Sequence, residues 1–223
     1  MDGNGRWAKE RNLPRIMGHK EGVNALREII RAASHLGVEA LTVFAFSSEN
    51  WKRPPEEVGF LMNLVIETLK TDLLEMMENR LILRTSGDLS GLPQATRDSI
   101  EDAKAKMAQN QGMIFNVAIN YGGRWELTQA CRALAAAAQA GKLQPEEIDE
   151  SRLDACLTTA GLPDPDLLIR TSGEQRISNF LLWQLAYSEL YFTDVKWPDF
   201  TPAEFYKAIG VYQKRQRRYG GLT

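Results

Sequence analysis

Apolar side chains recur at helical spacing in two stretches of the chain and form short unbroken runs elsewhere. Residues 22–36 carry apolar side chains three or four positions apart, which predicts an amphipathic helix that ends at Gly37. Residues 54–79 repeat the pattern behind Pro54 and Pro55, as is typical of proline at a helix start. The apolar run 40–46 predicts a parallel strand that is buried on both faces.

Weaker patterns continue the alternation of strands and helices. They predict strands over residues 81–84, 114–119, 167–169 and 190–192. They predict helices over residues 92–109, 124–140, 179–187 and 202–219, with one or two short helices in 145–160. Such alternation favours an α/β fold. We therefore expect a single domain over residues 1–223, with a central, mostly parallel sheet flanked by helices.

Composition narrows the function classes. The formal net charge of −2 argues against a general nucleic-acid-binding protein, which needs a basic surface. Cys131 and Cys156 lie far apart, without metal-ligand spacing, and suit free thiols in a reducing cytoplasm. No apolar run has the length of a membrane span, and the first residues are polar where a signal peptide is apolar.

Polar clusters follow three of the predicted strands, at residues 47–51, 120–124 and 170–178. The carboxyl ends of parallel strands meet at one edge of a sheet, where ligands bind in this fold class. In the third cluster, Arg170, Arg176 and Ser178 combine two guanidinium groups with a hydroxyl. That combination suits a diphosphate or a pair of phosphates.

The first eight residues, MDGNGRWA, predict a second anion site. Gly3 and Gly5 allow a sharp turn whose amide groups stay open to an anion. Arg6 adds a guanidinium group, and Asp2 beside the same phosphate suits a hard cation such as Mg²⁺. A surface turn at a chain end is the simpler alternative.

Arg15 and Arg53 extend this second basic group. A lone arginine is usually explained by a surface ion pair, but two basic groups on one sheet edge favour two anion sites. The sequence has no G-x-x-x-x-G-K-[ST] and no G-x-G-x-x-G after a strand, and it also lacks G-x-S-x-G and H-E-x-x-H. The two sites are therefore predicted without the usual ATP or NAD motifs.

Together these motifs resemble the cis-prenyltransferase family, and within it the bacterial undecaprenyl diphosphate synthases. The matching segments follow the family's order over nearly the whole chain: MDGNGRWA, GHK, FAFSSENW with Arg53-Pro54, NYGGRW, DLLIRTSGE, RISNFLLW and ELYF. The resemblance implies Mg²⁺-dependent addition of isopentenyl diphosphate to farnesyl diphosphate, with cis double bonds, to give undecaprenyl diphosphate for cell-wall synthesis. It also implies a homodimer that is cytoplasmic and peripheral at the inner face of the membrane, where product is released.

The resemblance assigns roles by position. Asp2 matches the essential aspartate that binds Mg²⁺, and Glu189 matches a second Mg²⁺ ligand. Positions that hold the allylic substrate are Gly3, Asn4, Gly5, Arg6, Trp7, Arg15 and His19. Positions of the closing loop are Ser47, Ser48, Glu49, Asn50, Trp51 and Arg53. Positions of the isopentenyl diphosphate site are Arg170, Arg176, Ile177 and Ser178, and the C-terminal positions that reach across a dimer are Arg218 and Gly220.

Asn50 matches a position assigned as the proton acceptor. An amide is a weak base, so we interpret Asn50 as an orienting group and expect the leaving diphosphate to take the proton. The helices over residues 22–36 and 55–79 would form the walls of an apolar tunnel for the product, an ordinary core being the alternative. Family members carry an apolar strand before the MDGN segment, and we expect that strand to be missing before Met1.

Two other functions stay open at this point. The first is a family-like but inactive partner subunit, which retention of Asp2, Glu189 and both arginine groups argues against. The second is a phosphohydrolase that uses the same cation and arginine sites. An all-helical trans-prenyltransferase is disfavoured because no D-D-x-x-D pair occurs.

Overall fold

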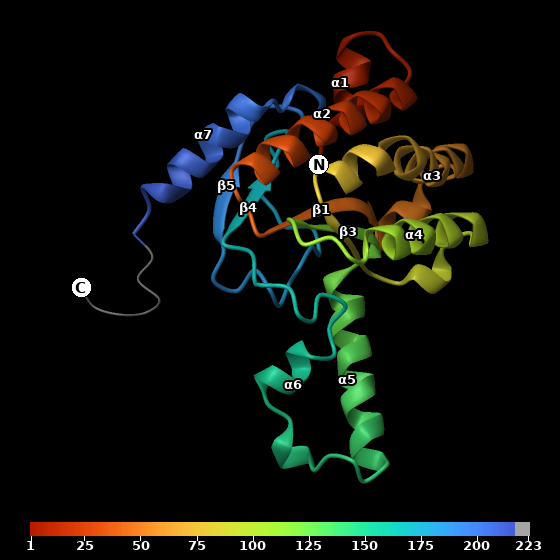
Figure 1. Ribbon diagram of the computed structural model, residues 1–223, viewed down its shortest axis with the longest axis vertical. Coiled ribbons are helices and arrows are strands. Elements are labelled where there is room, and N and C mark those ends of the chain that lie inside the picture. The colour runs from red at the N-terminus through yellow and green to blue at the C-terminus, as the bar shows by residue number, and fades with distance from the viewer. Residues whose placement is uncertain (217–223) are drawn as a thin grey trace.

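The computed structural model describes residues 1–216, whose strands form two parallel sheets (Figure 1). The larger sheet has the order β1-β3-β2, from β1 (Ala40–Ser47), β3 (Ile114–Tyr121) and β2 (Ile82–Ser86). The smaller sheet pairs β4 (Leu167–Arg170) with β5 (Glu189–Phe192). The parallel pairing is confirmed. The expectation of one central sheet was wrong, since the structure has two sheets. Thr171, which follows β4, forms its hydrogen bonds with Asp2 at the start of the chain and not with β1.

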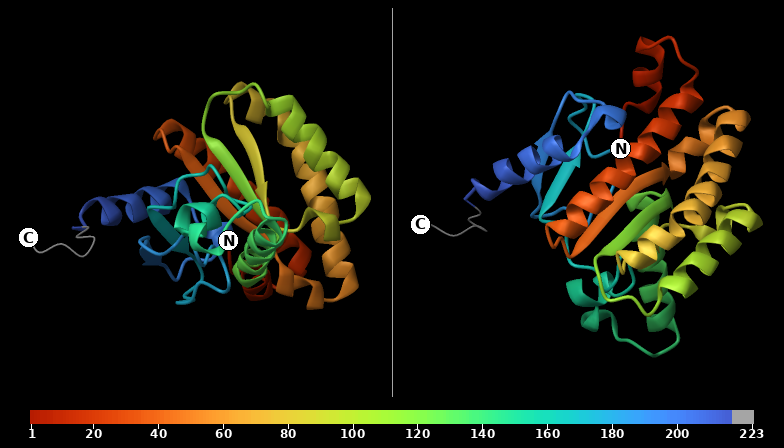
Figure 2. Two further views of the ribbon diagram at one scale, coloured as in Figure 1. Left: turned by 90° about the horizontal axis from the view of Figure 1, so that it is seen from below. Right: turned by 45° about the horizontal axis from the view of Figure 1, so that its top comes forward.

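The helices of the described residues are α1 (Asn4–Glu10), α2 (Arg15–His35), α3 (Pro55–Glu78), α4 (Gln94–Met107), α5 (Gly123–Gln139), α6 (Glu150–Asp154) and α7 (Pro202–Gln213). Figures 1 and 2 show α2, α3 and α4 along the larger sheet, whereas α5 extends away from it with α6 alongside. No helix within residues 1–216 is long and apolar enough to cross a membrane.

The boundaries of α3 confirm the sequence pattern, because the helix begins at Pro55 and ends one residue before Asn79. Helix α2 ends as predicted: Gly37 takes a left-handed φ of 71° and caps the last carbonyl groups. The helix starts at Arg15, however, well before the predicted start at residue 22. The first turns of α2 face α1, and a Cβ at Gly18 would lie only 2.0 Å from the carbonyl oxygen of Asn4. Glycine there serves close helix packing, which an apolar pattern does not reveal.

The helix expected over residues 179–187 is absent from the described structure and is replaced by turns. Ser178, Asn179 and Leu181 have φ values of 49°, 62° and 45°, in the left-handed region that a regular helix excludes. The final helix, expected to reach residue 219, ends at Gln213. Residues 217–219 lie outside the described residues.

The main core lies between the larger sheet and the helices α2, α3 and α4. Ile29, Phe46, Leu83 and Phe115 are among its buried members, each at most 4% exposed. A smaller apolar cluster around Tyr121 and the turns after residue 179 covers a second region of the sheet. The polar loops at the carboxyl ends of β1, β3 and β4 are thereby placed on a rigid support.

Candidate active site

The N-terminal turn lies directly against the end of β4. The amide of Asp2 donates to the Thr171 hydroxyl at 2.9 Å, and that hydroxyl donates to the Asp2 carbonyl at 2.9 Å. Gly3 has a φ of 102° and begins α1, and its Cβ position lies 2.6 Å from Ser172 Oγ. Only glycine fits this conformation and this approach without displacement. The predicted anion-binding turn is therefore held against the predicted diphosphate loop.

The carboxylate of Asp2 lies among donors and positive charge. Its Oδ1 accepts from the Gly3 amide at 2.7 Å, and its Oδ2 accepts from Arg170 Nη2 at 3.0 Å. Arg6 Nη2 lies 3.4 Å from Oδ1. Burial acts to raise the pKa of Asp2, but the hydrogen bonds from Arg170 and Gly3 and the charges of Arg170 and Arg6 outweigh it and lower the pKa. Asp2 is thus kept ionised.

Arg170 joins the two ends of the site. It is the last residue of β4, and its side chain is 15% exposed. One nitrogen donates to Asp2, while Nη1 donates to Ser178 Oγ at 2.8 Å and to the carbonyl oxygen of Arg176. This fork holds the 170–178 loop in a defined shape beside the N-terminal turn.

Glu174 connects the arginines of the two predicted sites. Arg6 Nη1 lies 2.9 Å from Glu174 Oε1, and Arg176 forms an ion pair with the other carboxylate oxygen. The side chains of Arg6 and Arg176 are 47% and 62% exposed, so both can turn toward an incoming anion. Two arginines from opposite ends of the sequence are thus neighbours in the fold.

A second group of cations surrounds Glu57, near the first turn of α3. Its Oε1 lies 3.1 Å from Arg15 Nη2, 3.0 Å from Arg53 Nη1 and 3.3 Å from His19 Nε2. Burial acts to raise the pKa of Glu57, but the charges of Arg15 and Arg53 and the hydrogen bond with His19 lower it overall. The predicted grouping of Arg15 and Arg53 is confirmed, with His19 beside them, although Arg6 belongs to the other network.

His19 and Asn4 lie where this group meets the apolar interior. Asn4 Nδ2 lies 3.4 Å from His19 Nδ1, and Asn4 Oδ1 is buried without a hydrogen-bond partner among residues 1–216. Burial lowers the pKa of His19; Glu57 opposes the shift, and the charges of Arg53 and Arg15 add to it. The imidazole is therefore neutral at pH 7. Gly5 adjoins the same place, since its Cβ position is 3.0 Å from Arg15 Cζ.

The segment between β1 and α3 spans the two cation groups. Asn50 Oδ1 accepts from the Ser47 amide at 3.1 Å, Glu49 Oε1 accepts from Asn179 Nδ2 at 2.8 Å, and Trp51 Nε1 donates to Asn120 Oδ1 at 2.7 Å. In addition, Ser48 Oγ lies 2.7 Å from the Cβ position of Gly122. The 47–51 and 120–124 loops meet as predicted, and Asn179, the residue after the 170–178 loop, contacts both of them, although that loop follows a strand of the second sheet.

Two predicted positions, Trp7 and Glu189, make their contacts outside both networks, whereas Ile177 stays in the 170–178 loop. Trp7 donates to Asp199 Oδ1 at 2.7 Å and carries the Arg11 guanidinium 4.2 Å above its ring, and neither partner belongs to the two cation groups. Glu189 begins β5, pairs with Arg215 Nη1 at 2.6 Å, and lies at the opposite end of the smaller sheet from Arg170. Ile177 is partly buried beside Ser178. The predicted residues Arg218 and Gly220 lie outside the described residues.

The surroundings of Asp2 fit a Mg²⁺ ion only when a substrate phosphate binds the same ion. Within residues 1–216 no three histidine, cysteine or acidic side chains come together as a metal cage. Mg²⁺ commonly binds one or two carboxylates together with substrate phosphates. The ionised Asp2, which is 38% exposed and lies beside Arg6 and Arg170, matches that donor set.

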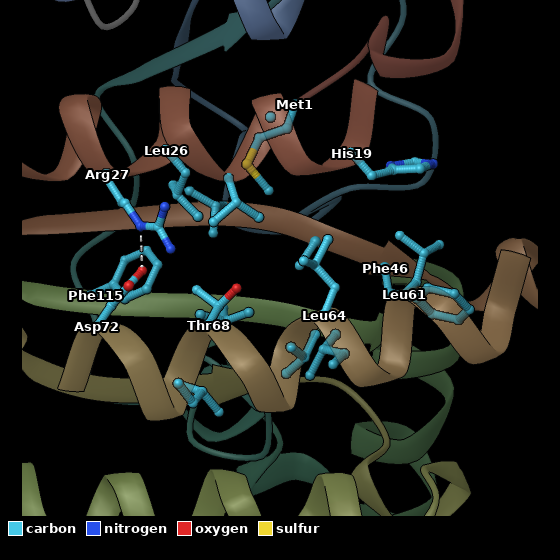
Figure 3. A pocket seen from close by; sticks show the side chains of 18 of the residues that line it. Met1, His19, Leu26, Arg27, Phe46, Leu61, Leu64, Thr68, Asp72 and Phe115 are labelled. Carbon is cyan, nitrogen blue, oxygen red and sulfur yellow. Dashed lines mark hydrogen bonds and ion pairs between the residues drawn. The ribbon is translucent and has the colours of Figure 1, made fainter. Parts of the chain in front are cut away.

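An apolar pocket opens behind the polar groups, between α2, α3 and the larger sheet (Figure 3). Asn4 and His19 line the pocket near the cations, and Leu26, Leu61 and Phe115 line its apolar walls. The expectation that α2 and α3 enclose a cavity is thus confirmed. The arrangement places charge-binding groups at the mouth of a space suited to a hydrocarbon chain.

Sequence reasoning missed Glu57 and Glu174 as members of the site. Glu57 follows Arg53 by four positions at a helix start, a spacing that signals a possible ion pair. Its contacts with Arg15 and His19, in contrast, join residues about forty positions apart and leave no local pattern. Glu174 lies inside the 170–178 cluster, where the arginines drew attention to anions and not to a carboxylate between them.

Comparison with known proteins yields one consistent match. Residues 1–220 match the prenyltransferase family described as "Putative undecaprenyl diphosphate synthase". The isoprenyl transferase of Bacillus subtilis (strain 168) is 54% identical over 222 residues, which cover 100% of this chain and 85% of that protein. The ditrans,polycis-undecaprenyl-diphosphate synthase ((2E,6E)-farnesyl-diphosphate specific) of Lactiplantibacillus plantarum is 51% identical, with coverage of 100% and 87%.

A solved structure agrees with these relatives. Lavandulyl diphosphate synthase from Lavandula x intermedia, crystallised in complex with dimethylallyl diphosphate, superposes with a TM-score of 0.96 at 41% identity. The superposition covers 99% of this chain and 95% of that one. The single α/β domain, with parallel strands flanked by helices, is therefore shared with an enzyme of prenyl diphosphates.

Proposed function

The chain belongs to the undecaprenyl diphosphate synthase family, and we propose that it elongates farnesyl diphosphate with isopentenyl diphosphate to give undecaprenyl diphosphate. One observation supports the proposal: His19, which contacts the Arg15–Arg53–Glu57 group, and Met1, the neighbour of Asp2, both line one apolar pocket. Two diphosphates held there would bring an allylic carbon and a double bond together, with the growing chain in the pocket.

Each residue group has a distinct task in this scheme. The turn at Gly3 and Gly5, with Arg6, holds the allylic diphosphate, and Arg15 and His19 adjoin it. Arg170, Arg176 and Ser178 hold isopentenyl diphosphate, and Ile177 lies against it. When a substrate diphosphate displaces the carboxylate of Glu57 or Glu174, the arginines that were paired with that carboxylate can bind the phosphate oxygens instead. The cations then stabilise the negative charge that develops on the leaving group.

Elongation breaks the allylic carbon–oxygen bond, joins the allylic carbon to the isopentenyl double bond and releases one proton. Mg²⁺, held by Asp2 and the substrate diphosphate, would neutralise charge on the leaving group. Asn50 orients the closing loop, because its amide oxygen holds the Ser47 amide. The proton passes to the departing diphosphate. Glu189 remains a proposed second ligand, and its pairing with Arg215 has to open for that role.

The assembly and the membrane contact are also proposals. Exposed apolar side chains on the β5 and α7 side, with Leu190 37%, Tyr206 45% and Val211 38% exposed, suit a second copy of the chain. Light scattering should then give the mass of a dimer. Arg218 and Gly220 are proposed to reach the partner's site.

The turn between α1 and α2 supports a transient contact with a membrane surface. Leu13, Ile16 and Met17 are 39%, 43% and 39% exposed beside the cations Arg11 and Arg15. Such a patch suits the inner face of a membrane with anionic lipids. Because lipid is as apolar as the tunnel and water is not, product release should be slow in water and accelerated by detergent or vesicles.

Incorporation of labelled isopentenyl diphosphate into extractable lipid tests the function. With farnesyl diphosphate and Mg²⁺ we expect incorporation, reduced by about a hundredfold or more in Asp2→Ala, as for loss of a key charge-stabilising group. The control Asp98→Ala removes an exposed carboxylate of α4 and should retain activity. Phosphate release without chain growth would instead support the phosphohydrolase. If the wild type forms no product either with or without Mg²⁺, the result would support the inactive partner subunit.

A further inference from the structure

A charged pair bridges the two walls of the apolar pocket toward the end away from His19, with Ile30 and Met76 lining the pocket one helical turn beyond it. Figure 3 shows His19 toward one end of the pocket and Arg27 with Asp72 toward the other, with apolar side chains between them. Arg27 lies on α2 eight residues after His19, which corresponds to about 12 Å along the helix. Asp72 lies on α3, so the pair ties the two walls of the pocket together.

Hydrogen bonds from neighbouring side chains hold both members of the pair in place. Arg27 Nε donates to Asp72 Oδ2 at 2.7 Å, and Arg27 Nη1 donates to Asn24 Oδ1 at 2.7 Å. The other carboxylate oxygen of Asp72 accepts from the Thr71 hydroxyl at 2.8 Å. The Asp72 side chain is only 10% exposed, whereas that of Arg27 is 32% exposed. Arg27 can thus turn outward to water, while Asp72 stays in the wall.

The space inside is small for a long chain. The pocket offers about 130 Å³ to the centres of water molecules. Pockets that bury a drug-sized ligand have volumes of about 300–1,000 Å³. An undecaprenyl chain is larger than such a ligand. Elongation therefore needs more room, and the Arg27–Asp72 pair, toward the far end of the pocket, lies in the path of a chain that grows away from His19.

We propose that the Arg27–Asp72 ion pair is a latch that the growing prenyl chain must displace, and that the latch limits the length of the product. An apolar chain end offers no hydrogen bond to either side chain. When the chain passes between Arg27 and Asp72, it therefore breaks their ion pair without replacing the lost hydrogen bond. Condensations before the chain reaches the latch are unaffected, and later ones are slowed. The inference rests on the proposed function, since it assigns a length-determining role within the same pocket.

The chain supplies a matched control for this latch. Arg31 and Glu75 form a second α2–α3 ion pair, with Arg31 Nη2 2.8 Å from Glu75 Oε2. Neither residue lines the pocket. Removal of this pair loosens the same two helices in the same way without opening the end of the pocket. Any effect on product length that is specific to the latch is therefore absent from the control.

The test compares product lengths by mass spectrometry after reaction with farnesyl diphosphate, isopentenyl diphosphate and Mg²⁺. The variant Arg27→Met/Asp72→Leu keeps similar volume and removes both charges. We expect its products to lengthen by one or more isoprene units and its intermediates beyond the latch to accumulate less. The control Arg31→Met/Glu75→Leu should keep the wild-type distribution. Asp72→Asn, which retains the shape of the wall, should shift the distribution in the same direction by less.

Several results would overturn the latch. Unchanged or shorter products from folded Arg27→Met/Asp72→Leu would do so, and so would an equal shift in the Arg31→Met/Glu75→Leu control. If the double variant does not fold, unchanged products from Asp72→Asn overturn it. A wild-type protein that makes no prenyl product contradicts the proposed function itself, and this result is distinguishable because it precedes any comparison of variants.

Discussion

Arg170→Lys tests the link between the two diphosphate groups. The lysine keeps the positive charge but has a single nitrogen, whereas Arg170 reaches Asp2, Ser178 and the Arg176 carbonyl at once. We expect the ammonium group to stay with Asp2 and to leave the 170–178 loop without its hydrogen bonds to residue 170. The positioning of that loop then weakens, although the net charge of the site does not change.

The expected size of the effect follows from the hydrogen bonds that a lysine cannot form. A hydrogen bond between a neutral and a charged group contributes about 1.5–3 kcal/mol. At about 1.4 kcal/mol per factor of ten, kcat/KM for isopentenyl diphosphate should fall by about 10- to 150-fold. Steady-state incorporation of the labelled substrate at saturating farnesyl diphosphate measures this, and thermal unfolding verifies that the variant is folded.

A matched arginine separates this effect from a general cost of substitution. Arg84 Nη2 also donates to a backbone carbonyl, that of Ala160, at 2.8 Å, but lies outside the site. Arg84→Lys should leave kcat/KM unchanged. If Arg170→Lys retained wild-type kcat/KM, or if both variants lost activity equally, the reasoning that the Arg170 fork organises the isopentenyl site would be refuted.

Three further predictions concern stability. Burial lowers the pKa of His19 against the opposing effect of Glu57, so the unfolded chain binds more protons than the folded chain below about pH 6.5. The free energy of unfolding should therefore fall as the pH drops below about 6.5, by at most about 1.4 kcal/mol per pH unit. Urea titrations at about pH 7 and pH 5.5 measure this fall, which should be weaker in His19→Gln. Tyr121→Phe removes a 2.6 Å hydrogen bond to the buried carboxylate of Glu126 and should cost about 1.5–3 kcal/mol, whereas Tyr206→Phe at an exposed position should cost almost nothing in the same denaturation assay. Gly18→Ala places a methyl group against the backbone of α1 and should lower the free energy of unfolding by about 1–3 kcal/mol, together with activity; an unchanged melting temperature would contradict the packing described for α1 and α2.

Most of the regular structure could be predicted because local signals agreed with the final fold. Pro55 marks the start of α3, and Gly37 marks the end of α2. The apolar run of β3 reflects a strand that is buried on both faces, but the same prediction for β1 was wrong, since only Val43 and Phe46 of that strand are buried. Where local and tertiary requirements diverge, the sequence pattern misled. Gly18 lies inside a helix because another helix passes close to it, and the left-handed residues after 177 suit the loop and not a helix.

The candidate site could be predicted only in part, for a related reason. Clusters of arginine and glycine after strands indicate anion sites without any knowledge of distance. Which carboxylate pairs with which arginine depends on contacts across the whole chain. Glu57 and Glu174 gain their meaning only when α2 meets α3 and the N-terminal turn meets β4. The Arg27–Asp72 pair, whose members lie on different helices, was likewise invisible in the sequence pattern.

The product formed from farnesyl diphosphate, isopentenyl diphosphate and Mg²⁺ tests the central claim most directly. Mass spectrometry gives the number of units added, and nuclear magnetic resonance gives the geometry of the new double bonds. The account predicts a polyprenyl diphosphate of undecaprenyl length whose added units are cis, and no such product from Asp2→Ala. Trans units, addition that stops after a single condensation, or diphosphate cleavage without a new carbon–carbon bond would contradict it.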